Sequence, residues 1–232
     1  MSELHEIKKG QTGYGVLIEN DGFMQISESL QNKKLIESIN DGPDGWFVPK
    51  PFVVDAVLQK YGIKNANGRI YPEHVLKPEV EKYQRLIAEK MALGECNHPS
   101  DSTIDLGRIS HNIVECHWEG HTLVGKLELN ISEGFRKHGI CSTFGDTCAQ
   151  LMLQGWKIGI SSRGVGEVKQ RMGETYVESY ELLAFDIVAT PSTPGAYLST
   201  DGAEPLRQYV ESPESKSILD DKIDAIEKIL KG

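Results

Sequence analysis

The chain has 232 residues, of which 39% are hydrophobic and 25% charged, as expected for a soluble globular protein of one domain with appendages or of two small domains. Its net charge of −9 disfavours an intrinsic binder of nucleic acid or of an anionic membrane, because both require a basic face. The cysteines Cys96, Cys116, Cys141 and Cys148 form no CxxC pair and are interpreted as reduced thiols, and neither a secretion signal nor a membrane span is expected.

The first 45 residues are polar and interrupted by turns, and no periodicity predicts an element there. Short strands are expected at 47–48 and 52–54, followed by a loop at 65–68. A helix is predicted to begin near Pro78, a favourable first-turn residue, and to end before Gly94 as its C-terminal cap. Its apolar stripe consists of Val80, Tyr83, Ile87 and Met91.

Residues 108–129 predict a β-hairpin that closes at Glu119-Gly120, with Trp118 opposite His121. This register predicts one buried face, made of Val114, Cys116, Trp118, Leu123, Leu127 and Leu129. The closely spaced His111, His117 and His121 raise the alternative of a zinc site. The register directs His121 away from the other two and so disfavours metal binding.

A second helix is predicted from Asp146, as N-cap, to Gln154, with Gly155 ending it. Strands are expected at 158–164 and 165–170, then a turn at Met172-Gly173, a strand from Thr175 and an apolar run over 182–189. A polar linker over 199–216 precedes an amphipathic helix near 218–230, which either packs on its own domain or serves as a partner-binding or removable tail. Strands dominate the middle of the chain, which favours a partly closed sheet or small barrel with helices outside.

Three residues are candidates for catalysis. Ser161 lies between glycines in GISSRG (159–164), and a serine hydroxyl needs a nearby base to act as a nucleophile. His98 lies at a rigid turn before Pro99 and is a candidate base. Asp186 lies in an apolar strand, where a carboxylate requires a partner, and is a candidate for orienting the histidine. Each also has an ordinary structural interpretation: a turn histidine, a strand serine and an aspartate paired with an arginine.

An oxyanion site is expected beside the serine. The main-chain N–H groups over Ser162, Arg163 and Gly164, with the Arg163 side chain nearby, are the candidate donors, each worth roughly 3 kcal/mol in a transition state. Two alternatives are weaker. Cys96 as nucleophile lies too close in sequence to His98, and the glycines of 159–166 lack the lysine of a phosphate-binding loop.

Four segments together resemble the prohead core proteases of T-even-like bacteriophages. They are NANGRIYP (65–72), LGECNHP (93–99), GW (155–156) leading into GISSRG (159–164), and FDIV (185–188) followed by Pro191-Ser192. The likeness covers residues 46–198, which we expect to be the protease domain, between a polar segment 1–45 and the linker and terminal helix 199–232.

The resemblance implies an α+β fold of the herpesvirus-protease type, a β-barrel surrounded by helices. It implies a serine endopeptidase with His98 as base and Ser161 as nucleophile, needing no metal and no cofactor. Asp186 carries over less directly, because herpesvirus relatives use a second histidine. Ser161 is preferred to Ser162, because it follows the Gly-x pair that precedes the nucleophile in related enzymes. Alternating side-chain directions along a strand mean that only one of the two serines can face His98.

The resemblance also implies where such an enzyme acts: in the host cytoplasm, inside the assembling prohead, on scaffold and capsid proteins. Neither nucleic acid nor membrane is an expected partner, and the oligomeric state is open, a homo-oligomer included. T-even-like members cut after Glu with Leu or Ile two positions before it, so Leu17-Ile18-Glu19 and Leu35-Ile36-Glu37 are candidate self-processing sites, with Ala225-Ile226-Glu227 an imperfect third. The rival interpretations are a non-catalytic capsid or scaffold-binding module and a metal-dependent hydrolase using the hairpin histidines.

Overall fold

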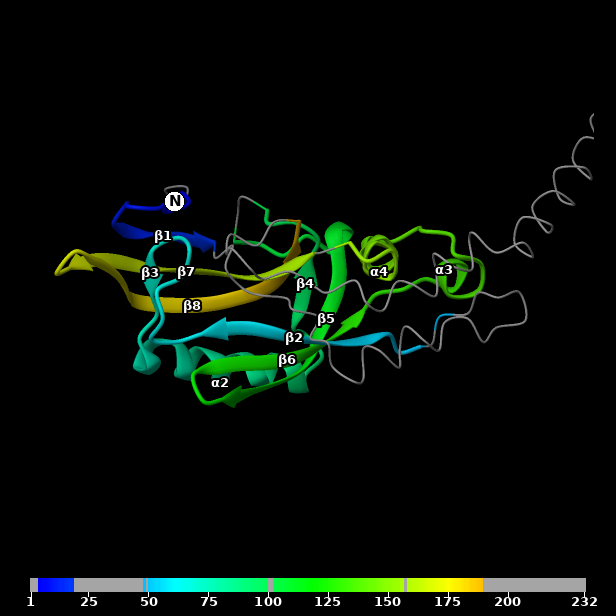
Figure 1. Ribbon diagram of the computed structural model, residues 1–232, viewed down its shortest axis with the longest axis horizontal. Helices are drawn as coiled ribbons and strands as arrows, with labels where there is room; N and C mark the ends of the chain where they lie inside the picture. The colour runs from blue at the N-terminus through cyan, green and yellow to red at the C-terminus, as the bar shows by residue number, and fades with distance from the viewer. Residues whose placement is uncertain (1–3, 19–47, 49, 100–101, 157, 190–232) are drawn as a thin grey trace, which may run out of the picture.

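The computed structural model describes residues 4–18, 48, 50–99, 102–156 and 158–189. Its elements are β1 (Gly13–Ile18), β2 (Val53–Lys60), β3 (Arg69–Ile70), α2 (Glu73–Ala88), β4 (Leu93–Glu95), a 3-10 turn (Leu106–Arg108), β5 (Ile109–Glu119), β6 (Thr122–Leu129), α3 (Glu133–His138), α4 (Phe144–Leu153), β7 (Gly159–Arg171) and β8 (Glu174–Val188). The strands form two four-stranded sheets, ordered β1-β7-β8-β3 and β2-β6-β5-β4 (Figure 1). None of the helices in the described segments is long and apolar enough to cross a bilayer.

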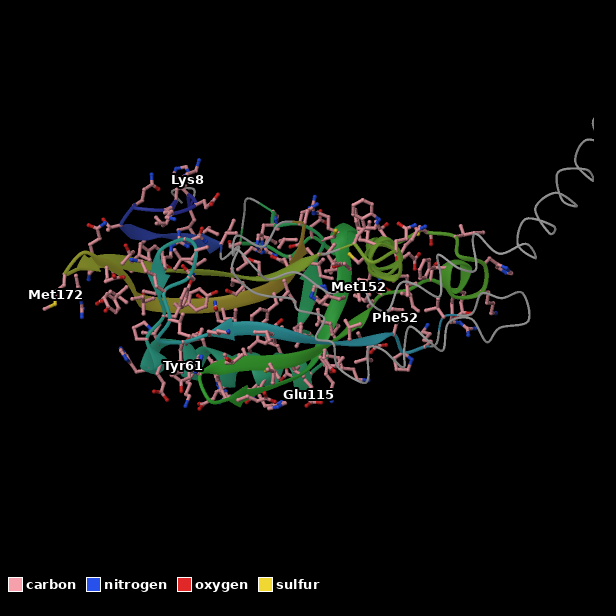
Figure 2. The ribbon with its side chains drawn as sticks, viewed as in Figure 1. Lys8, Phe52, Tyr61, Glu115, Met152 and Met172 are labelled. Carbon is pink, nitrogen blue, oxygen red and sulfur yellow. The ribbon has the colours of Figure 1, made fainter. Side chains whose placement is uncertain are left out.

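The first sheet is built on the long antiparallel hairpin β7–β8. Its turn is Met172-Gly173, as the sequence predicts, and both residues have positive φ angles of 52° and 82°, which suits a tight two-residue hairpin loop. Met172 projects from the tip of the hairpin (Figure 2). The two strands predicted over 158–170 are one continuous strand, which carries Ser161, while β8 carries Asp186.

The predicted hairpin over 108–129 is confirmed as β5–β6, but its register differs from the prediction by two residues. Trp118 pairs with Leu123 instead of His121, and the loop is Gly120-His121. The reason is that Gly120, with φ of 59°, occupies the first loop position, where a two-residue hairpin favours glycine. A bulge between Ile113 and Glu115 then makes Ile113, and not Val114, the fully buried residue at that level.

Helix α2 begins at Glu73, five residues before the predicted start, so Pro78 lies inside the helix instead of in its first turn. The inward face includes Leu76, Val80 and Tyr83, whereas Met91 is exposed beyond the helix end. Gly94 does not cap the helix, because it belongs to β4. A Cβ at Gly94 would come within 2.3 Å of the His111 ring and of the Phe185 carbonyl oxygen, so glycine allows β4 to approach its neighbours closely.

Helix α4 begins at Phe144, two residues before the predicted N-cap. Thr143 is the N-cap: its hydroxyl accepts the N–H of Asp146, and the Asp146 carboxylate accepts the N–H of Thr143, forming a capping box. Gly155, with φ of 76°, follows the end of the helix as predicted. The short helix α3, which the sequence analysis does not predict, is capped by Ser132.

The predicted α+β class is confirmed, but the closed herpesvirus-protease-like barrel is not. Among the described residues the strands remain in two sheets, whose edge strands include β3 of two residues and β4 of three.

The sheets meet where Cys96, just after β4, forms a parallel bridge with Ile187 of β8. Helix α2 lies against β8 and β5, with the Tyr83 and Phe185 rings edge to face at 5.3 Å. The core draws on both sheets and α2; its members include Phe52, Val54, Leu58, Leu76, Tyr83, Ile113, Leu127, Val168, Phe185 and Ile187.

The polar N-terminal segment contributes a strand that its composition does not predict. Within residues 1–45, β1 pairs antiparallel with β7 from Gly13↔Val168 to Ile18↔Arg163, and Val16 and Leu17 are fully buried. Residues 1–3 and 19–45 of that segment, and all of the predicted linker and helix over 199–232, lie outside the described residues. The three proposed segment boundaries therefore stay predictions.

Candidate active site

His98 is positioned by the chain that leaves β4. The N–H of Asn97 donates to the Ile187 carbonyl at 2.7 Å, and Asn97 adopts a φ of 64°, so the chain turns beside β8. On the other side, Arg108 Nη2 donates to the Cys96 carbonyl at 2.7 Å. These two anchors hold the backbone immediately before His98 against the edge of β8.

Ser161 and Asp186 are direct cross-strand partners in the β7–β8 hairpin. Residues opposite each other in an antiparallel pair project to the same face, so both side chains point toward the histidine turn. The neighbouring Ser162 points to the other face, where its hydroxyl accepts a hydrogen bond from Gln59 Nε2 of β2 at 2.9 Å. The alternation of the strand therefore brings Ser161, and not Ser162, to His98.

The three side chains form one continuous chain of hydrogen bonds. His98 Nε2 lies 2.6 Å from Ser161 Oγ, and His98 Nδ1 lies 2.8 Å from Asp186 Oδ2. Ser161 and Asp186 are fully buried, and the His98 side chain is 9% exposed. With Nδ1 protonated, the ring donates to the carboxylate and accepts the serine hydroxyl, which is the arrangement needed for proton transfer from serine to histidine.

Asp186 is held as a carboxylate. Burial pushes its pKa upward, but hydrogen bonds from His98 and Arg163 and the positive charge of Arg163 outweigh this, so its pKa is lowered below the usual value. Four donors reach its two oxygens. Oδ2 accepts from His98 Nδ1 and from Arg163 Nε at 2.7 Å, and Oδ1 accepts from the Glu95 N–H at 3.1 Å and from Arg163 Nη2 at 3.3 Å.

The Arg163 side chain does not lie where an oxyanion donor is expected. Its fully buried guanidinium contacts Asp186, Glu95 and the Thr103 carbonyl. The contact with Glu95 is one that the sequence analysis does not predict. No local signal could have found this contact, because nothing in either segment indicates that two strands 68 residues apart meet.

The backbone of Ser162 is directed differently from that of Arg163. The Ile187 carbonyl accepts the Asn97 N–H, so the backbone N–H and C=O groups of Ile187 point away from β7. Along an antiparallel pair, residues whose backbone groups point toward the partner strand alternate with residues whose groups point away from it. Ser162, paired with Phe185, therefore also directs its N–H away from β8, on the side of β1. By the same alternation Arg163 directs its N–H to β8.

The other candidate nucleophile and the hairpin histidines are placed elsewhere. The Cys96 thiol lies 3.9 Å from the sulfur of Cys148. The β5 bulge separates His111, which is buried, from His117, which is exposed. Burial lowers the pKa of His111 to about 4, against the opposing effects of Asp186 and the Phe185 carbonyl, so this ring is neutral at physiological pH. The described residues contain no group of three or more metal-binding side chains.

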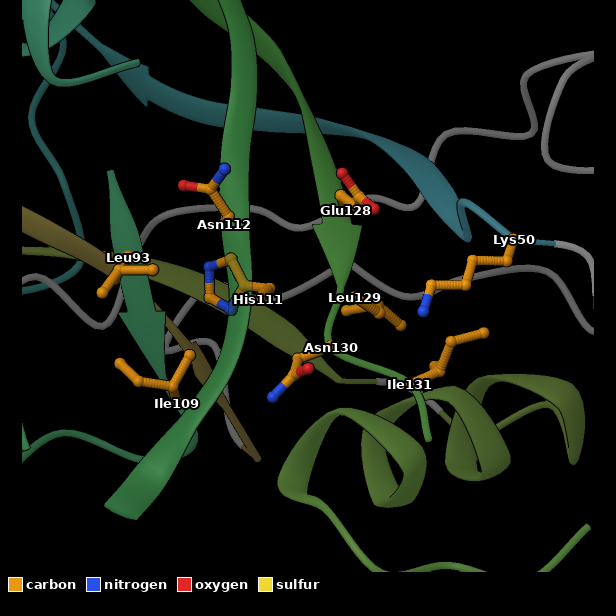
Figure 3. Close-up of a pocket in the computed structure, with 9 residues that line it drawn as sticks. All are labelled: Lys50, Leu93, Ile109, His111, Asn112, Glu128, Leu129, Asn130 and Ile131. Atoms are coloured by element: carbon orange, nitrogen blue, oxygen red, sulfur yellow. The ribbon is translucent and has the colours of Figure 1, made fainter. Parts of the chain in front are cut away.

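A cavity of about 340 Å³ opens on the second sheet, where β4, β5 and β6 lie side by side (Figure 3). Its lining comprises Lys50, Leu93, Ile109, His111, Asn112, Glu128, Leu129, Asn130 and Ile131. Ser161, His98 and Asp186 are not part of this lining, so the cavity is distinct from the hydrogen-bonded chain of side chains described above.

Comparison with known proteins places the chain in a family. Residues 15–204 match the family described as prohead core protein serine protease. The prohead core protein protease of Enterobacteria phage T4 is 31% identical over 188 residues, which cover 79% of this chain and 83% of that protein. The solved structure of the bacteriophage T4 capsid assembly protease superposes with a TM-score of 0.59 at 25% identity, covering 76% of this chain and 98% of the other. By sequence and by fold, the chain belongs to the prohead core protein serine protease family.

Proposed function

We propose that this protein is a serine endopeptidase of phage capsid maturation, with Ser161 as nucleophile, His98 as general base and Asp186 as the residue that orients the histidine. The observation that supports this most directly is the hydrogen-bonded chain Ser161–His98–Asp186, with both heavy-atom distances below 2.9 Å. Family membership supports the reaction class. The scaffold and capsid proteins of the assembling prohead are the proposed substrates; the names of the T4 relatives, a prohead core protein protease and a capsid assembly protease, support this choice.

The proposed reaction is acyl transfer. His98 Nε2 accepts the Ser161 proton as Oγ attacks the scissile carbonyl, and the imidazolium that forms is stabilised by Asp186 across the 2.8 Å contact. His98 then protonates the leaving amine, and water hydrolyses the acyl-enzyme with His98 acting as base again. Of the predicted oxyanion donors, we retain the Ser162 N–H, because the alternation of the hairpin points it away from β8.

The proposed specificity is cleavage after Glu with Leu or Ile two positions before it, and it has a structural consequence for self-processing. At Leu17-Ile18-Glu19, Leu17 is fully buried and Ile18 is 8% exposed within β1. A protease binds its substrate in an extended and accessible form, so cleavage there requires β1 to leave the sheet. The other two candidate sites lie outside the described residues.

The test uses Ser161→Ala beside Ser162→Ala. Each purified chain is incubated with the scaffold protein of the same phage, and the products are identified by intact mass. We expect Ser161→Ala to abolish cleavage and Ser162→Ala to retain measurable activity, because the Ser162 hydroxyl faces Gln59. Cleavage by Ser161→Ala at the wild-type rate refutes the proposed nucleophile, and a wild-type chain that cuts neither itself nor the scaffold supports the non-catalytic module instead.

A further inference from the structure

Behind the candidate triad lies a fully buried cluster of charges. Arg163 Nε donates to Asp186 Oδ2 at 2.7 Å, while its Nη2 contacts both Asp186 Oδ1 and Glu95 Oε2. Relative exposure is 0% for all three residues. Glu95 is held in turn by the N–H of Asp105, which donates to Oε1 at 3.1 Å.

The arrangement of charge is unusual for the carboxylate of a triad. An arginine paired directly with Asp186 neutralises the negative charge that has to stabilise the imidazolium of His98. Glu95 supplies a second carboxylate against that single cation. With Glu95 ionised, the cluster keeps one net negative charge when His98 is neutral, and becomes neutral when His98 takes the serine proton. Burial and the charge of Asp186 raise the pKa of Glu95, whereas the charge and hydrogen bond of Arg163 and the Asp105 N–H oppose this shift and favour the ionised form.

We propose that Glu95 is a positioning residue for the reaction: by pairing with Arg163, it keeps the negative field of Asp186 acting on His98. This inference rests on the proposed serine protease function. It assigns Arg163 and Glu95 to the support of Asp186, and it gives the glutamate of the LGECNHP segment a role that depends on its charge as well as on its hydrogen bonds.

Four other charged or titratable side chains lie near the cluster, and the test has to separate their effects from that of Glu95. Arg108 Nε lies 3.9 Å from Glu95 Oε1 and is buried, although 37% of the Arg108 side chain is exposed, so Arg108 offsets part of the Glu95 charge in every variant alike. His111 is neutral, and burial raises the pKa of Tyr83 well above its usual value. Cys96 titrates in the neutral range: its hydrogen bond with Cys148 lowers its pKa to about 7, burial opposing and Arg108 assisting this shift.

The test measures reactivity of Ser161 as a function of pH with a fluorescent fluorophosphonate. In this reaction a serine Oγ–P bond forms, fluoride leaves, and His98 takes the serine proton. The variants are Glu95→Gln, Arg163→Met and the double variant, each made on a Cys96→Ala background so that the thiol does not titrate. Glu79→Gln is the matched control, because Glu79 is a buried carboxylate that accepts the Leu182 N–H, at a position on β8 four residues before Asp186.

Glu95→Gln retains the shape of the side chain and an acceptor for the Asp105 N–H. We expect it to lower the labelling rate of Ser161 about 10- to 100-fold. We also expect the acid limb, the part of the rate–pH profile where the rate falls as the pH is lowered, to shift to lower pH by about one unit. The shift is to lower pH because removing a negative charge makes the His98 imidazolium less stable, so the ring is protonated only at lower pH. Arg163→Met should not move the limb downward, and the double variant should bring it back to within about half a unit of the wild-type position. Glu79→Gln should leave the limb in place.

The two ideas fail separately. If wild type is labelled at Ser161 but the Glu95→Gln limb does not move, or if Arg163→Met moves it downward, Glu95 has a structural role only and the inference is overturned. If Ser161→Ala is labelled as fast as wild type, the proposed function itself fails. Should Glu95→Gln not fold, the comparison of Arg163→Met with the double variant decides, because the second differs from the first by the charge of Glu95 alone.

Discussion

Replacing Asp186 with asparagine tests the candidate triad most severely, because the change preserves shape and removes only a charge and one acceptor. Both carboxylate oxygens accept two hydrogen bonds, so neither can become an NH₂ group without facing donors. If the amide nitrogen takes the place of Oδ1, it meets the Glu95 N–H and Arg163 Nη2. If it takes the place of Oδ2, it meets His98 Nδ1–H and Arg163 Nε.

The second orientation has a chemical consequence. His98 can then escape the clash only by moving its proton to Nε2, and in that tautomer it cannot accept the proton of Ser161. In either orientation the negative charge that stabilises the imidazolium is lost. We therefore expect a fall in kcat/KM of about 10³- to 10⁴-fold, the loss seen when the carboxylate of a serine–histidine–aspartate triad is neutralised. The free energy of unfolding should fall by about 3 kcal/mol, the cost of leaving a buried donor without an acceptor.

The assay compares kcat/KM on a scaffold-derived peptide and the urea midpoint with those of Asp146→Asn. Asp146 is a matched control, because it is a buried carboxylate with five donors around it, from Ser132, Ser142 and Thr143, at the start of α4. It should lose comparable stability and keep its activity under folding conditions. An Asp186→Asn enzyme within tenfold of wild type would falsify the assigned role of this carboxylate.

Three further predictions concern the scaffold of the site. Gly94→Ala should cost about 1–3 kcal/mol of stability and lower activity, since its Cβ would lie 2.3 Å from the Phe185 carbonyl, whereas Gly134→Ala, with no atom closer than 3.7 Å, should be near neutral by thermal unfolding. Thr143→Ala should lose about 1 kcal/mol in urea titration, and an unchanged midpoint would contradict the N-cap. Hydrogen bonds outweigh burial and lower the pKa of Asp146. The contribution of this carboxylate to the free energy of unfolding should therefore be complete above about pH 4 and decline as the pH falls through its folded-state pKa. Asp146→Asn should reduce this loss of stability at acid pH, measured by urea unfolding as a function of pH.

Much of the local structure followed from short-range rules. The hairpin turn at Met172-Gly173 and the end of α4 before Gly155 were predictable, because glycine is the residue that most readily adopts a positive φ. The errors came from tertiary competition. Pro78 looked like a helix start, but α2 extends back to Glu73 and its inward face includes Leu76, which lies in the core. Strand β1 was missed because its burial depends on β7, more than 140 residues later.

The sequence by itself determined the chemical types at the site and the alternation that allows only one of two adjacent serines to face the histidine turn. Only the tertiary structure decided which one, by placing Gln59 of the other sheet against Ser162 and bringing His98 to Ser161. It also moved Arg163 from a predicted oxyanion donor to a buried partner of Asp186 and Glu95. The physical reason is range: side-chain direction along a strand is set by its neighbours in sequence, whereas a buried charge is matched by whatever strand the fold packs beside it.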